Sequence, residues 1–76
     1  MPRYRKVDYK NIAWMIRMAV IKSGTDQRLL DVVASLQSHT GLCLDVKRIQ
    51  RILGSRCVEK VEQDGDVKRV VTMVIL

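Results

Sequence analysis

Apolar residues recur at helical spacing in three separate segments of the chain, and each segment has residues typical of helix ends. The first segment begins at Asp8, a favourable N-cap, and ends at Ser23, before Gly24. Its inward stripe is predicted to be Ile12, Ile16, Ala19 and Val20. The second begins near Thr25–Asp26, ends at Gly41, and has an inward stripe of Leu29, Leu30, Val33 and Leu36.

The third segment is a short basic helix that follows a turn at 40–44. Asp45 is its predicted N-cap, and Val46, Ile49 and Leu53 share one face. The opposite face carries Lys47, Arg48 and Arg51. The pattern therefore predicts a helix that is anchored by apolar residues and displays cations, with Leu42 and Leu44 filling the angle against the second helix.

After Leu53 the pattern becomes strand-like and predicts a β-hairpin. Its strands are expected over 58–63 and 67–76, with a two-residue turn at Asp64–Gly65 and an apolar inner strand at the C-terminal end. Val58 and Val61 are three residues apart, which predicts a bulge or a frayed end. This turn would place Lys60 opposite Arg69, a pair that either contacts a phosphate or is neutralised by Glu59 and Glu62.

These elements predict one α+β domain at residues 8–76, with three helices followed by a β-hairpin wing. Residues 1–7 form a basic N-terminal arm, in which Arg3 and Arg5 either reach a nucleic-acid groove or are solvated. A chain of 76 residues has no room for a separate catalytic domain.

The first helix carries a second apolar stripe on its other side. This stripe consists of Trp14, Met18 and Ile21, at positions i, i+4 and i+7. Two arrangements fit: either the helix is buried on both sides, or the second stripe is exposed and binds a protein partner or a second copy of the chain.

The formal charge of +6, from 14 Lys and Arg against eight Asp and Glu, favours a polyanionic partner such as nucleic acid. A positive domain within a larger neutral protein fits the same balance. Cys43 and Cys57 are far apart and are predicted to be small buried thiols in a reducing compartment. We predict no enzyme activity, cofactor or metal, because the single histidine, His39, and the scattered carboxylates form no catalytic or ligand set.

No apolar run approaches the length of about 20 residues that a membrane span needs, and the N-terminus lacks the apolar segment of a secretory signal. We therefore expect no membrane partner and a cytoplasmic or nuclear location.

The order helix, helix, turn, helix, hairpin resembles the winged helix-turn-helix superfamily over Asp8 to Leu76. The resemblance implies a small transcriptional regulator that reads double-stranded DNA with the third helix, through Lys47, Arg48, Gln50 and Arg51. It implies wing contacts through Lys60, Lys68 and Arg69. The acidic tip residues Asp64 and Asp66 would be repelled by phosphates and are not expected to bind.

A protein-interaction domain is the alternative, because many winged helices bind proteins. The stretch 46–53, followed by Val58-Glu59-Lys60-Val61, is also similar in pattern to the C-terminal winged-helix domain of cullins. This resemblance implies that a lysine on or near the first helix is modified by a ubiquitin-like protein, and Lys22 is the nearest candidate. The final strand departs from that family because it lacks aromatic residues. In this alternative, a partner binds Trp14, Met18 and Ile21 on the first helix.

Overall fold

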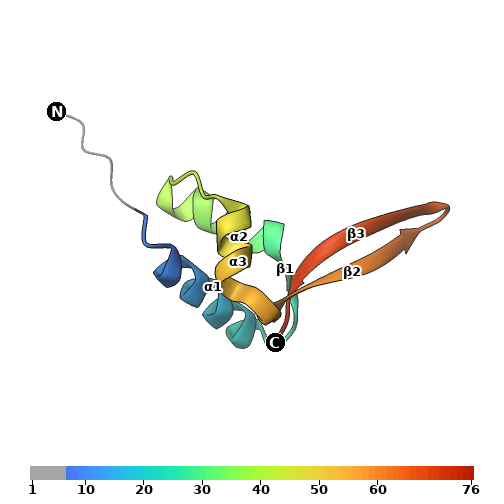
Figure 1. Ribbon diagram of the computed structural model, residues 1–76, viewed down its shortest axis with the longest axis horizontal. Helices are drawn as coiled ribbons and strands as arrows, with labels where there is room; N and C mark the ends of the chain where they lie inside the picture. Colours follow the sequence, from blue (N-terminus) through green and yellow to red (C-terminus); the bar gives the residue numbers. More distant parts are fainter. Residues whose placement is uncertain (1–6) are drawn as a thin grey trace.

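A computed structural model describes residues 7–76, which form three helices and a three-stranded antiparallel sheet (Figure 1). The elements are α1 (Tyr9–Ser23), β1 (Gln27–Arg28), α2 (Leu29–Thr40), α3 (Val46–Leu53), a 3-10 turn η1 (Gly54–Arg56), β2 (Cys57–Asp64) and β3 (Val67–Val74). The predicted α+β class, with three helices followed by a hairpin, is confirmed. Arg3 and Arg5 of the predicted N-terminal arm lie outside the described residues.

Local capping fixes the ends of α1 and α3 as the sequence predicts. The Asp8 side chain accepts from the backbone N–H of Asn11 at 3.2 Å, and the Asp45 side chain accepts from that of Arg48 at 3.3 Å. Gly24, with φ of 74°, supplies the left-handed residue that ends α1. These boundaries depend on residues within one helical turn, which explains why the sequence reveals them.

The start of α2 differs from the prediction. Arg28, with no side-chain capping bond, occupies the N-cap position that we expected near Thr25–Asp26. Gln27 and Arg28 instead form β1, paired with Val74 and Met73 at the end of β3. The Asp26 carboxylate accepts from the backbone N–H of Leu76 at 2.7 Å, so it holds the end of the chain rather than a helix start.

The hairpin is longer and more regular than predicted. Its pairing is continuous from Cys57 opposite Val74 to Asp64 opposite Val67, so the bulge prediction is wrong. The two turn residues are Gly65 and Asp66, and the positive φ of Gly65 (62°) lies at the first central position, as in a type II′ turn. A turn one residue later changes every cross-strand partner by two positions.

The predicted pairing of Lys60 with Arg69 is therefore wrong. Lys60 lies opposite Val71, and Arg69 lies opposite Glu62. The interpretation that two facing cations bind a phosphate loses its geometric basis, because a cation and a carboxylate face each other instead.

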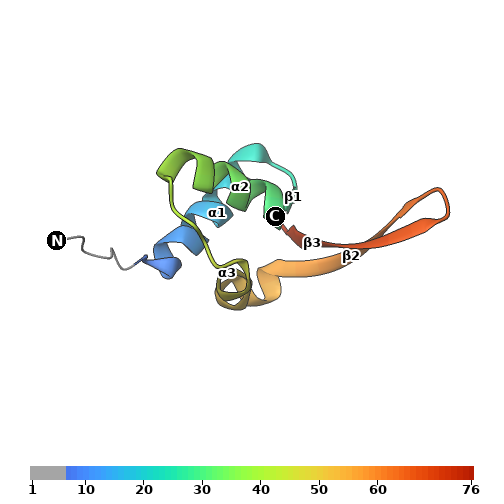
Figure 2. The same ribbon diagram turned by 90° about the horizontal axis from the view of Figure 1, so that it is seen from above.

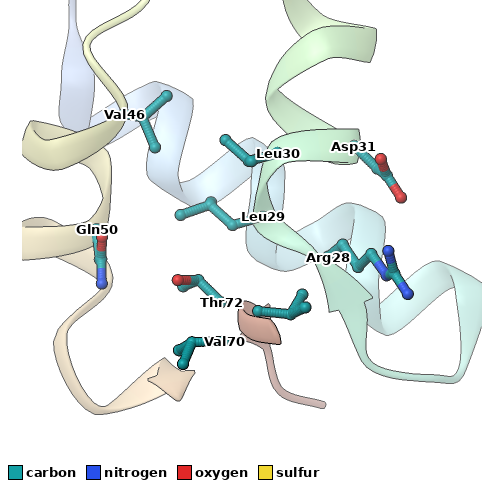
Figure 3. Close-up of a pocket in the computed structure, with 9 residues that line it drawn as sticks. Arg28, Leu29, Leu30, Asp31, Val46, Gln50, Val70 and Thr72 are labelled. Carbon is teal, nitrogen blue, oxygen red and sulfur yellow. The ribbon is translucent and has the colours of Figure 1, made fainter. Parts of the chain in front are cut away.

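The core lies where α1, α2, α3 and the base of β3 meet. Its buried members are Ile12, Ala13, Ile16, Val20, Leu29, Val33, Leu44, Ile49, Leu53 and Val74, with Leu42, Leu36 and Val46 packed against them. Two predicted core residues are exposed: Ala19 and Leu30, which is 66% exposed, whereas Ala13, which was not predicted, is buried. Leu29 fills the inward position of the first turn of α2, and Leu30 instead lies in the pocket lining opposite Val46 (Figure 3).

The hairpin projects away from the helices, as Figure 2 shows in side view. Only its base contributes to the core, through Val74, whereas Val61 and Val70 farther out are 67% and 65% exposed. Two ion pairs link the hairpin to the β1 segment: Arg28 to Glu62 at 2.7 Å, and Lys60 to Asp26 at 3.7 Å. Within residues 7–76, no helix is long and apolar enough to cross a membrane.

Candidate nucleic-acid interface

The outward face of α3 carries Lys47 and Arg51. The helix is fixed from beneath by Ile49, which is fully buried, and by Leu53. At 100° per residue, Lys47 and Arg51 lie opposite this buried side, and both are exposed. The sequence prediction of an anchored helix with a cationic surface therefore matches the position of these two side chains.

Arg48 belongs to the same helix but lies toward α1. Its guanidinium carbon is 4.6 Å from the centroid of the Tyr9 ring, within the range of a cation–π contact. The Tyr9 hydroxyl also accepts from the backbone N–H of Asp45 at 3.1 Å. One tyrosine thus contacts both the N-cap and the first turn of α3, a role that the sequence pattern did not suggest.

Gln50 lies at the edge of a pocket of about 260 Å³ between α2, α3 and β3. Figure 3 shows Val46 and Gln50 on the α3 side of this pocket, Leu30 on the α2 side, and Val70 and Thr72 on the strand. Gln50 is half-buried, in contrast to its exposed neighbours Lys47 and Arg51. It therefore flanks the cationic face, toward the hairpin.

The three hairpin cations predicted to contact DNA lie on two different faces of the sheet. Lys68 is two and four residues from Val70 and Thr72, so it shares with them the face that lines the pocket beside Gln50. Lys60 and Arg69 lie on the opposite face, with the acidic side chain of Glu62. The structure therefore places Lys68 on the face of Val70 and Thr72, and Lys60 and Arg69 on the other face.

Carboxylates lie close to the cations on the Lys60 face of the hairpin. Asp26 is 3.7 Å from Lys60, and Glu62 accepts two hydrogen bonds from Arg28, at 2.7 and 3.0 Å. Asp64 and Asp66 are exposed at the tip. Sequence reasoning did not reveal the role of Arg28 in holding Glu62, because a pairing across 34 residues has no local signal.

The second apolar stripe of α1 is exposed. Trp14, Met18 and Ile21 have exposed fractions of 59%, 42% and 51%, so α1 is not buried on both sides. Of the two arrangements that the sequence left open, the structure has the one with a free apolar face.

Neither cysteine is deeply buried. Cys43 is exposed, which makes the prediction of a buried thiol wrong at that position, because its neighbours Leu42 and Leu44 take the inward places. Cys57 is half-buried at the hairpin base, where desolvation raises the pKa of its thiol above the ordinary value. Cys57 therefore stays protonated at neutral pH and is a weak nucleophile.

His39 lies against the backbone of its own helix. The Nδ1 atom of His39 lies 3.2 Å from the carbonyl oxygen of Ser35, one turn earlier in α2. Among residues 7–76, no three His, Cys, Asp or Glu side chains are grouped so that they could hold a metal ion.

Comparisons with protein families, with curated proteins and with solved structures found no match for this chain.

Proposed function

We propose that the chain is a winged-helix DNA-binding module, a small transcriptional regulator that reads duplex DNA with α3. The observation that carries this proposal is the position of Lys47 and Arg51, exposed on a helix whose other side is fixed by fully buried Ile49. Such a module acts in the cytoplasm or the nucleus, where duplex DNA is present.

The size of α3 suits the major groove. An α-helix with its side chains is about 10–12 Å across, which matches a groove about 12 Å wide. In this arrangement Arg51 is the side chain best suited to read a base, because a guanidinium can donate two parallel hydrogen bonds to guanine. Lys47 contacts phosphate, and Gln50 contacts bases at the side nearest the hairpin.

Lys68 provides a backbone contact from the wing, because it lies on the hairpin face that borders the α3 pocket. Arg48 contacts phosphate beside α1, where the Tyr9 ring limits its side-chain freedom. Lys60 and Arg69 make no primary contact in this proposal. They lie on the face opposite to that of Val70 and Thr72, and the Asp26 carboxylate is 3.7 Å from Lys60, whereas a carboxylate near a phosphate backbone is unfavourable.

The test is fluorescence anisotropy of a labelled mixed-sequence duplex, titrated with the purified chain at about 50 and about 200 mM salt. With about five phosphate contacts, the slope of log K against log salt is expected near −4 to −5. Lys22→Ala on α1 is the control variant: it also removes one exposed cation, but at a position remote in sequence from α3, and it should leave the affinity for DNA nearly unchanged. Absence of binding by a folded chain at low salt would contradict the proposal.

A second candidate function is protein interaction through α1, and one observation favours it. Trp14, Met18 and Ile21 form an exposed apolar stripe on a helix whose other side already fills the core. Large apolar side chains clustered on a surface are typical of interaction sites. If α1 has this function, Trp14→Ala abolishes association, which co-sedimentation measures. The melting temperature, followed by circular dichroism, changes little.

A further inference from the structure

We infer that the exposed face of α1 binds an acidic amphipathic helix. The inference rests on the second candidate function, a partner surface on α1, and adds the chemistry of the partner. It is independent of DNA reading by α3.

The apolar part of this surface extends beyond the α1 stripe. A shallow pocket beside Trp14 is walled by Ala13 of α1 and by Ile52 and Leu53 at the end of α3. Ile52 is 42% exposed although it is a large aliphatic residue. Trp14 therefore belongs both to the apolar stripe and to the lining of a pocket that can receive a partner's side chain.

The charged residues around the pocket all have one sign. Lys10, Arg17 and Arg56 complete its lining, and none of its lining residues is acidic. Lys22 adds a fourth cation near Ile21, and α1 contains no Asp or Glu between Tyr9 and Ser23. None of these four cations is in an ion pair found among residues 7–76.

The charge and the apolar side chains of this surface together indicate which class of partner fits it. A second copy of the chain would bring these cations against their own counterparts, and like charges across an interface are unfavourable. A polynucleotide would match the charge but not the aliphatic Met18 and Ile21, which offer no flat ring for base stacking. A helix with apolar residues at i, i+3, i+4 and i+7 and flanking Glu or Asp matches both features.

The test uses three synthetic peptides of about 14 residues that share one apolar helical face and differ only in the flanking residues, Glu, Gln or Lys. Trp14 is the only tryptophan of the chain, so tryptophan-free peptides allow its emission to report binding directly. We expect the Glu peptide to shift the emission to the blue, and to bind at least about tenfold more tightly than the Lys peptide.

A charge reversal provides the variant. Lys10→Glu combined with Arg56→Glu reverses the charge of two exposed residues that line the pocket beside Trp14. This double variant should bind the Lys peptide more tightly than the Glu peptide. Lys68→Glu combined with Arg69→Glu changes the net charge equally on the hairpin and should leave the Glu-peptide preference intact. Circular dichroism establishes that both variants fold.

Each other outcome overturns the inference in an identifiable way. Equal binding of all three peptides would keep α1 as a docking surface but remove the acidic partner. Concentration-dependent self-association without peptide binding would show a second copy as the occupant. A blue shift with anionic lipid vesicles alone would show a membrane surface, and no response from a monomeric chain would remove the partner function of α1 altogether.

Discussion

The α3 helix and the β2–β3 hairpin each offer three cations, and they differ in how many carboxylates their own segments contain. Val46–Leu53 contains no Asp or Glu, and the carboxylate of Asp45, the residue before it, is used as the helix cap. In the hairpin, Lys60, Lys68 and Arg69 are interspersed with Glu59, Glu62, Asp64 and Asp66. The hairpin thus has more negative than positive charges, whereas α3 is strongly positive.

The backbone geometry increases this difference. A helix anchored on one side presents its polar residues on the other, so Lys47 and Arg51 share one surface. A strand sends successive side chains to opposite faces, so the neighbours Lys68 and Arg69 point in opposite directions. A count of cations therefore overestimates the hairpin as a binding surface.

Arg51→Ala should give the largest effect on DNA binding. Loss of a bidentate base contact is expected to cost about 1–3 kcal/mol on the preferred duplex and to relax the preference at one base pair. Competition anisotropy with single-base variants of a selected site measures both quantities. A small, equal loss on every duplex would contradict base reading by Arg51.

Tyr9→Phe should loosen the attachment of α3 to α1. The substitution removes the hydrogen bond to the Asp45 backbone N–H but keeps the ring beneath Arg48, so we expect about 0.5–1.5 kcal/mol lower stability. Urea denaturation followed by circular dichroism measures this change. A stability equal to that of the unchanged chain would contradict a structural role of the Tyr9 hydroxyl.

Lys68→Ala and Lys60→Ala should show which face of the hairpin contacts DNA. Removal of Lys68 is expected to weaken all duplexes alike and to reduce the salt slope by about 1, because one phosphate contact is lost. Removal of Lys60 should leave the slope unchanged, since this lysine lies on the other face, near Asp26. Salt titrations of both variants test the assignment, and the reverse pattern would show that the opposite face meets the DNA.

Neutralising the acidic tip should give the smallest effect. Asp64→Asn with Asp66→Asn removes two exposed negative charges that repel phosphates, and we expect DNA binding about two- to fourfold tighter at low salt. The gain should be small and should fade at higher salt, because exposed charges are screened beyond about 10 Å at 0.1 M salt. Anisotropy at two salt concentrations measures the gain. Weaker binding after this change would indicate that the carboxylates contact DNA bases or support the turn.

Much of the helical structure followed from local patterns. The caps Asp8 and Asp45, the terminator Gly24, and the buried residues Ile16 and Ile49 were all predictable, because their signals lie within one or two turns. The cationic residues of α3 were also identifiable, since burial of Ile49 and Leu53 leaves Lys47 and Arg51 on the outside.

The β1 strand, the hairpin register and the ion pairs were not predictable from such patterns. A two-residue strand has no periodicity, and Asp64–Gly65 and Gly65–Asp66 are both acceptable turns. The observed register pairs Val74 with Cys57 on one side and with Gln27 on the other, and no local pattern indicates these pairings. Tyr9 and Arg28 gained their roles from contacts that span 36 and 34 residues.

The sequence alone determined three helices, a hairpin, the buried stripes and a basic third helix, because hydrophobic periodicity and capping are properties of neighbouring residues. Tertiary structure decided which of the cations share a surface, which face of the hairpin Lys68 joins, and that the Trp14 stripe remains exposed. These features depend on the pairing of distant segments and on how much apolar surface the small core can cover, and neither quantity is encoded in a local pattern.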